Sequence, residues 1–268
     1  MTSWQKTTKY IAMAFAILLC IGIIGGSISL LALLFGLGRG SETADFKGYA
    51  ITQEVTKLRL DLGTTRLTIQ EGDTLRVEVR SPYLKVTEKD GTLSIREKRP
   101  WLNLRGWDSE LRIYVPAGTI WDEADIDGGA GTITIDTLSA RRLKLNLGAG
   151  KMDVQELNVW TQADIDGGAG QISIEGGTMT NLNLDMGVGS LTIQSRLQGS
   201  SSLDLGVGLS QITLLGDKED YYLKLRKGMG ELRLNGEKLE ANTVYGAGPN
   251  RIDVDGGVGS VQLSFDEP

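Results

Sequence analysis

Hydrophobic and polar residues alternate along most of this chain, and glycines interrupt the alternation at regular intervals. The repeated pattern is two alternating segments joined by Gly-x-Gly or a close relative. Eight copies occur, and five of them follow one another at intervals of 19 or 20 residues. The first glycines of the eight copies are Gly63, Gly129, Gly148, Gly168, Gly187, Gly206, Gly228 and Gly257. Period-two alternation predicts β-strands, and a repeat of about 20 residues with two strands per copy predicts stacked rungs.

Three columns of aliphatic residues align when each copy is numbered from its first glycine. Three positions before the glycine stand Leu60, Ile126, Leu145, Ile165, Leu184, Leu203, Leu225 and Val254. Six positions after it stand Ile69, Ile135, Val154, Ile174, Ile193, Ile212, Leu234 and Leu263. The column four positions after it is also apolar, except at Ser210. Because one rung cannot bury its own apolar face, we expect an all-β, β-helix-like solenoid with aliphatic ladders inside.

The repeated glycines are interpreted as structural. Each pair falls where one strand turns into the next, and glycine tolerates positive φ and close backbone approach. The pairs in the regular part of the repeat are Gly129 and Gly131, Gly148 and Gly150, Gly168 and Gly170, Gly187 and Gly189, and Gly206 and Gly208. A dinucleotide site would need a third glycine and a following helix, and residues 132–135 continue as a strand instead.

The stretch from Tyr10 to Leu37 contains no charged residue. As a helix it would be about 42 Å long, enough to cross a hydrocarbon core of about 30 Å. Lys6 and Lys9 precede it without an acid, which predicts a single-pass cell-membrane protein with a cytoplasmic N-terminus and an extracytoplasmic C-terminal domain. A cleaved signal peptide is the alternative, and it would export the same domain.

The rest of the chain is organised around this segment. We expect a cytoplasmic tail at 1–9, a transmembrane α-helix at 10–38, a linker at 39–56 and the β-solenoid at 57–268. Residues 84–98 read as a hairpin that turns at Lys89-Asp90-Gly91.

Composition excludes several kinds of chemistry. The chain has no His, so His-dependent catalysis and His metal ligands are ruled out. Cys20 is the only cysteine, which excludes an intrachain disulfide. The formal net charge is −6, which argues against a nucleic-acid partner. We therefore expect no enzyme activity, no cofactor and no metal.

The chain resembles the bacterial putative-adhesin β-strand-repeat family, a domain of unknown function often found on membrane-anchored envelope proteins. The resemblance is carried by the strand at 111–115 followed by Pro116 and by the Gly-x-Gly repeats after it, and it covers roughly residues 57–265. It implies a repeated β-strand fold and an adhesive role. It supplies no catalytic or binding residues.

A column of acidic residues stands two positions before the marker glycines, and it would lie on the outer face of the stack. Asp166, Asp185 and Asp204 are its regular part. Like charges about 4.8 Å apart repel by roughly 0.9 kcal/mol in bulk water, and calcium could relieve that repulsion. A solvated face, partly compensated by basic residues such as Lys144, is the favoured interpretation.

A basic and aromatic segment runs from Arg96 to Trp107 in an otherwise acidic region. Its candidate ligand-binding residues are Arg96, Arg99, Trp101, Arg105 and Trp107. Exposed Trp beside Arg could bind a glycan, an anionic wall polymer or a lipid headgroup. The alternative, which we favour, is that the two tryptophans cap the open end of the coil.

Three functions remain. The first is a non-catalytic, adhesin-like module that binds a cell-envelope polymer, a glycan or a protein. The second is an envelope scaffold that assembles through its exposed coil edges. The third is a polysaccharide-cleaving β-helix enzyme, which would need acids and bases clustered in a lateral groove.

Overall fold

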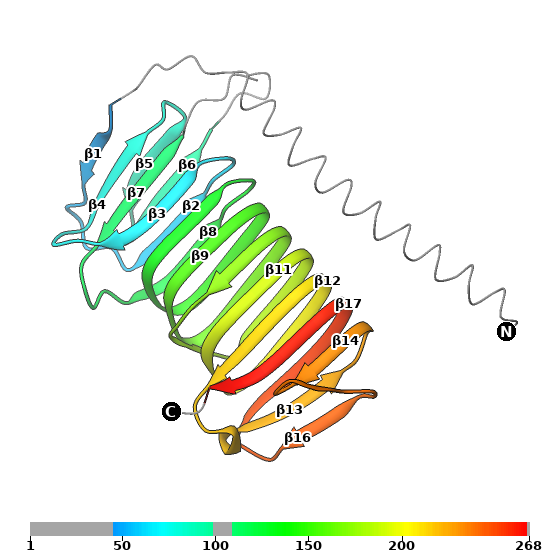
Figure 1. Cartoon of the computed structure of the whole chain (residues 1–268). Helices are drawn as coiled ribbons and strands as arrows, with labels where there is room; N and C mark the ends of the chain where they lie inside the picture. Colours follow the sequence, from blue (N-terminus) through cyan, green and yellow to red (C-terminus); the bar gives the residue numbers. More distant parts are fainter. Residues whose placement is uncertain (1–44, 99–108, 267–268) are drawn as a thin grey trace, which may run out of the picture. The chain divides into compact units, whose positions relative to one another are not determined.

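The computed structural model describes residues 45–98 and 109–266, and these residues form an all-β stack of rungs (Figure 1). Its only helical element in this part of the chain is the short 3₁₀ turn η1 (Lys218–Asp220). The strands are β1 (Lys47–Ala50), β2 (Lys57–Asp61), β3 (Arg66–Glu71), β4 (Arg76–Arg80), β5 (Leu84–Lys89), β6 (Thr92–Glu97), β7 (Glu110–Val115), β8 (Trp121–Asp127), β9 (Thr132–Ile174), β10 (Thr178–Thr180), β11 (Leu182–Gln198), β12 (Ser200–Leu215), β13 (Tyr221–Arg226), β14 (Met229–Leu234), β15 (Glu237–Lys238), β16 (Thr243–Gly246) and β17 (Asn250–Asp266).

The rungs pair in parallel, and the register follows the repeat. Leu184 of β11 pairs with Ile165 of β9 on one side and with Leu203 of β12 on the other. Each long strand bends at its Gly-x-Gly, and the pairing resumes beyond the bend, where Ile193 lies between Ile174 and Ile212. Every rung therefore presents one outer face before the bend and another after it.

The aliphatic columns predicted from the sequence form the core. All eight residues three positions before the marker glycine are at most 2% exposed, and the column six positions after it is likewise buried. Trp121 and Tyr221 are the largest side chains buried with them. This confirms that the rungs share one continuous apolar interior.

The glycine bends stack with their backbones almost touching. Gly189 has φ +149°, a conformation that L side chains rarely adopt, and a Cβ added there would overlap the carbonyl oxygen of Gly170 one rung away. Gly208 repeats both features against Gly189. Gly150, Gly170 and Gly259 share the positive φ and the close approach, so at these five bends the second glycine is fixed by conformation and by packing together.

Chain order and stacking order differ at both ends of the stack. At the C-terminal end, β17 lies between β12 and the pair β13 and β14, although it follows them in the chain (Figure 1). At the other end, β2 lies between β6 and β8, and β3 lies between β7 and β9. The last copy of the repeat in the chain is therefore inserted one place inward from the C-terminal end of the stack.

Antiparallel strands cover both ends. Beyond β6 and β7 lie β5, β4 and β1, and beyond β13 and β14 lie β16 and β15. The predicted hairpin is confirmed as β5 and β6, with Asp90 and Gly91 at positive φ in the turn. The strand β1 lies inside the segment 39–56 that we expected to be a linker, so that expectation is corrected there.

The single-pass membrane localisation is also corrected. In residues 45–98 and 109–266 no helix is long and apolar enough to cross a membrane. The predicted tail and transmembrane helix, residues 1–38, lie outside the described residues.

Replacing Gly189 with Ala is expected to lower the free energy of unfolding by roughly 3 kcal/mol or more, because it combines a strained φ with a backbone overlap. Val188→Ala is the matched control in the same bend, and its partly exposed side chain predicts a cost of about 1 kcal/mol or less. Urea unfolding of both variants measures the difference. Equal costs would contradict the close approach of the bends.

Candidate functional site

Arg96 is the only residue of the predicted Arg and Trp site that the structure describes. It lies on β6, and its Nε is 3.1 Å from Oδ2 of Asp61 on the neighbouring strand β2. Arg99, Trp101, Arg105 and Trp107 lie outside the described residues. The structure therefore shows Arg96 paired with an acid of the outer face.

Beside Arg96, the side chain of Glu97 closes the first glycine bend. Its Oε2 accepts hydrogen bonds from the backbone N–H of Gly63 (2.7 Å), the backbone N–H of Thr64 (3.1 Å) and the hydroxyl of Thr65 (2.8 Å). In the inner rungs the acceptor is a backbone carbonyl of the preceding bend. The N–H of Ala149, for example, donates to the carbonyl of Gly129. Glu97 thus supplies the acceptor where no preceding Gly-x-Gly bend is described.

The acidic column predicted from the sequence is present on the face before the bend. Asp166, Asp185 and Asp204 pair in register on successive rungs, and Asp255 continues the series. At the C-terminal end of the column the next residue is Arg226, whose Nη2 lies 2.7 Å from Oδ2 of Asp255. The hydrogen bond to Asp255 raises the pKa of the Arg226 guanidinium above its usual value.

The arginines place a positive charge at each end of the acidic column, as Arg96 does beside Asp61. Within the described part of the chain, no group of three or more His, Cys, Asp or Glu side chains is arranged to hold a metal ion. Asp166, Asp185 and Asp204 are exposed and, although stacked in register, form no such group. The column is a solvated acidic face.

The face after the bend is chemically different. On β11, β12 and β17 its outward positions form three rows of three, which we call the neutral grid. The rows are Ser190, Leu209 and Ser260; Thr192, Gln211 and Gln262; and Gln194, Thr213 and Ser264. None of the nine side chains is charged.

Ion pairs lie on the same face to either side of the neutral grid. On β9, two rungs before β11, Lys151 lies 2.7 Å from Asp153, and on β14 Arg233 lies 2.7 Å from Glu231. Each pair joins two residues of one strand on the same face, so its charges offset each other locally. The rung next to β11 carries Gln171 and Ser173, which pair with Ser190 and Thr192, and the exposed Glu175 follows them. The nine grid positions themselves are uncharged.

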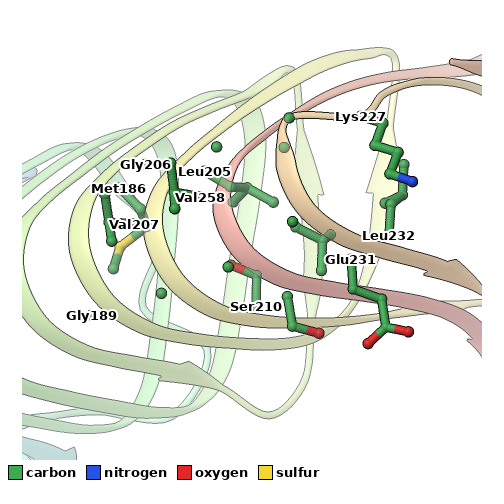
Figure 2. Close-up of a pocket in the computed structure, with 18 residues that line it drawn as sticks. Met186, Gly189, Leu205, Gly206, Val207, Ser210, Lys227, Glu231, Leu232 and Val258 are labelled. Atoms are coloured by element: carbon green, nitrogen blue, oxygen red, sulfur yellow. The ribbon is translucent and has the colours of Figure 1, made fainter. Parts of the chain in front are cut away.

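A small cavity lies inside the last bends of the stack (Figure 2). Its lining includes Met186, Leu205 and Ser210. Ser210 pairs with Leu191 and Val261, and it occupies a core position that is apolar in the other seven copies. The hydroxymethyl group is too small to fill the space of Leu or Ile, which leaves the cavity.

The cavity is a packing feature more than a ligand pocket. Ser210 is 8% exposed, and its hydroxyl makes no hydrogen bond to any residue in 45–98 or 109–266. The remaining lining consists mainly of glycine bends and aliphatic side chains. Lys227 and Glu231 also line it, and each is ion-paired, Lys227 with Glu240 at 3.6 Å and Glu231 with Arg233 at 2.7 Å.

Sequence reasoning did not identify the neutral grid. Its rows at the third, fifth and seventh positions after the glycine could have been read from the repeat. Ser260, Gln262 and Ser264, however, join it only because β17 is inserted beside β12. In chain order the neighbouring rung would be β14, with Glu231 and Arg233.

A family model described as Toastrack DUF4097 matches residues 55–248. No curated protein matches the chain. Among solved structures, the chain is similar to a putative adhesin from Bacteroides fragilis NCTC 9343, with 15% identity, 83% of this chain and 98% of that chain covered, and a TM-score of 0.42.

Two further solved structures are similar over most of their length. A putative cell adhesion protein from Clostridium sporogenes ATCC 15579 is 18% identical, with 83% of this chain and 99% of that chain covered and a TM-score of 0.33. A putative lipid binding protein from Parabacteroides distasonis ATCC 8503 is 12% identical, with coverage of 85% and 98% and a TM-score of 0.29.

Filling the cavity is expected to stabilise the protein. Ser210→Val should raise the free energy of unfolding by about 1 kcal/mol, because it adds apolar contacts without removing a hydrogen bond. The matched control is Ser195→Val, a buried serine whose hydroxyl donates to the carbonyl of Gly176 at 3.3 Å. That change should cost about 1 kcal/mol, and chemical denaturation compares the two. A loss of stability in Ser210→Val would contradict the packing defect.

Proposed function

This chain belongs to the Toastrack DUF4097 family, and we propose that it is a non-catalytic binding module of the adhesin type. The observation that carries the proposal is the pair of outer faces that every inner rung exposes in strict register. One face is an acidic column and the other includes the neutral grid. Such regular faces can contact an extended polymer at several equivalent points, as solenoid surfaces do.

The scaffold alternative is less well supported by the ends of the stack. Long exposed edge strands favour end-to-end pairing, whereas short ones oppose it. The edge strands here are short, and β1 and β16 have four residues each. The enzyme alternative needs clustered acids and bases in a groove, whereas the acidic column is spaced one residue per rung along an outer face.

The segment from Arg96 to Trp107 remains part of this proposal as a second candidate contact. Its two tryptophans could stack on sugar rings or on other planar groups. Arg96 is engaged with Asp61, so the contribution of the segment would come mainly from Arg99, Trp101, Arg105 and Trp107.

Binding of the full-length protein to isolated bacterial cell envelopes tests the proposal. We expect saturable binding, and we expect no release of soluble sugar from the envelopes during prolonged incubation. A variant with Trp101→Ala and Trp107→Ala, checked for folding by its β-sheet circular dichroism, is measured alongside. Lost binding in this folded variant would locate the contact at the tryptophans.

Absence of saturable binding by the unmodified protein would refute the binding-module proposal. Defined oligomers or filaments that form with increasing protein concentration would then favour the scaffold. Release of sugar fragments would favour the enzyme.

A further inference from the structure

We propose that the neutral grid binds an uncharged polysaccharide, laid across the strands β11, β12 and β17. The inference rests on the proposed binding function and specifies its ligand class and its site. It begins from a difference between the two faces of the same rungs. On these three strands the face before the bend carries Asp185, Asp204, Asp253 and Asp255, whereas the grid carries no charge.

Charge selects the ligand class. The whole chain has a formal net charge of −6, so an anionic wall polymer is repelled by the protein as a whole and finds no compensating cation on the grid. A cationic ligand would prefer the acidic face on the other side of each rung. An uncharged polymer suffers neither penalty on the neutral grid, and this complementarity favours a neutral glycan.

The side chains of the grid are available for hydrogen bonding. Among the residues that the structure describes, Ser190, Thr192, Gln211, Ser260 and Gln262 make no side-chain hydrogen bond to the protein. Hydroxyl and amide groups both donate and accept, as sugar hydroxyls do, so each can pair with either kind of atom on a glycan.

Leu209 gives the grid an apolar contact. It is 62% exposed in the middle of the first row, between Ser190 and Ser260. An exposed leucine among hydroxyls can pack against the C–H face of a sugar ring, while the neighbouring groups bond to the hydroxyls at the ring edge. The combination of one apolar contact with surrounding uncharged polar groups fits a sugar better than it fits a fully apolar ligand.

The geometry of the sheet predicts how the binding behaves. Adjacent rungs lie about 4.8 Å apart, and outward residues along one strand recur about every 6.6 Å. Each hydrogen bond to an exposed group replaces one to water, so one contact contributes little and affinity must come from several contacts together. We therefore expect affinity to rise with the length of the oligosaccharide.

Affinity electrophoresis of the full-length protein tests the inference, with gels that contain dextran, β-glucan, mannan or galactan. Polygalacturonate serves as the anionic comparison. We expect retardation by at least one neutral polysaccharide and none by polygalacturonate, with little effect of salt on the binding.

A triple variant with Thr192→Ala, Gln211→Ala and Gln262→Ala removes the middle row of the grid and should weaken binding by roughly tenfold or more. The matched control is Asn183→Ala with Ser202→Ala, on the opposite face of β11 and β12. The control should bind as the unmodified protein does, and circular dichroism establishes that both variants are folded.

The outcomes separate the inference from the proposed function. Envelope binding that the triple variant retains in full would overturn the grid as the site and leave the binding module standing. Equal retardation by polygalacturonate, or no retardation by any neutral polysaccharide, would overturn the ligand class. In a further outcome, the unmodified protein and the control variant form concentration-dependent oligomers that the triple variant does not form. This result would show that the grid contacts a second copy of this chain, and it would also overturn the inference.

Discussion

The contact of one glycine bend with the next is the constraint on which the rest of this structure depends. In five of the bends the second glycine has a positive φ, and a side chain there would overlap the carbonyl of the neighbouring bend. Consecutive rungs can therefore stack only with their bends aligned. This alignment fixes the register of both flanking strands, and the register in turn builds the aliphatic columns inside and the chemically uniform columns outside.

The same alignment allows the ends of the stack to be rearranged without loss of pairing. Any segment with the repeat pattern can pair with two other rungs, one on each side. The strand β17 pairs in this way with β12 and β14. Its insertion places Ser260, Gln262 and Ser264 beside β12 and moves Glu231 and Arg233 one rung outward. The inserted rung therefore sets the extent of the neutral grid, and the antiparallel strands beyond it leave only short edges.

The interior could be predicted from the sequence because two of its columns are aliphatic in all eight copies. The third column is apolar in every copy except at Ser210. The hairpin at Asp90 and Gly91 could be predicted because its turn chemistry is local. The stacking order of the rungs could not be predicted. The spacing of the marker glycines shows how many residues separate two copies of the repeat, but it does not show which copies become neighbours in the stack. The strand β1 was missed because it is short and depends on pairing with β4, which is distant in the chain.

The surfaces were harder to predict than the core. Burial requires apolar residues on every rung, whereas the outer faces have no such requirement. Which residues lie side by side on an outer face depends on the stacking order of the rungs. The acidic column was found because it repeats in consecutive copies, but the neutral grid needed the place of β17. The described residues contain no helix long and apolar enough to span a membrane, and the apolar stretch from which the localisation was predicted lies outside them.

An engineered disulfide can show whether the last rung of the chain lies between β12 and β14. In a chain with Cys20→Ser, the pair Gln211→Cys and Gln262→Cys places two cysteines on adjacent rungs about 4.8 Å apart, within the range that a disulfide can bridge. The pair Gln211→Cys and Arg233→Cys places them two rungs apart. With β17 between β12 and β14, mild oxidation should crosslink the first pair and leave the second unlinked. A crosslink in the second pair alone would show that the rungs stack in chain order and would contradict the insertion of β17.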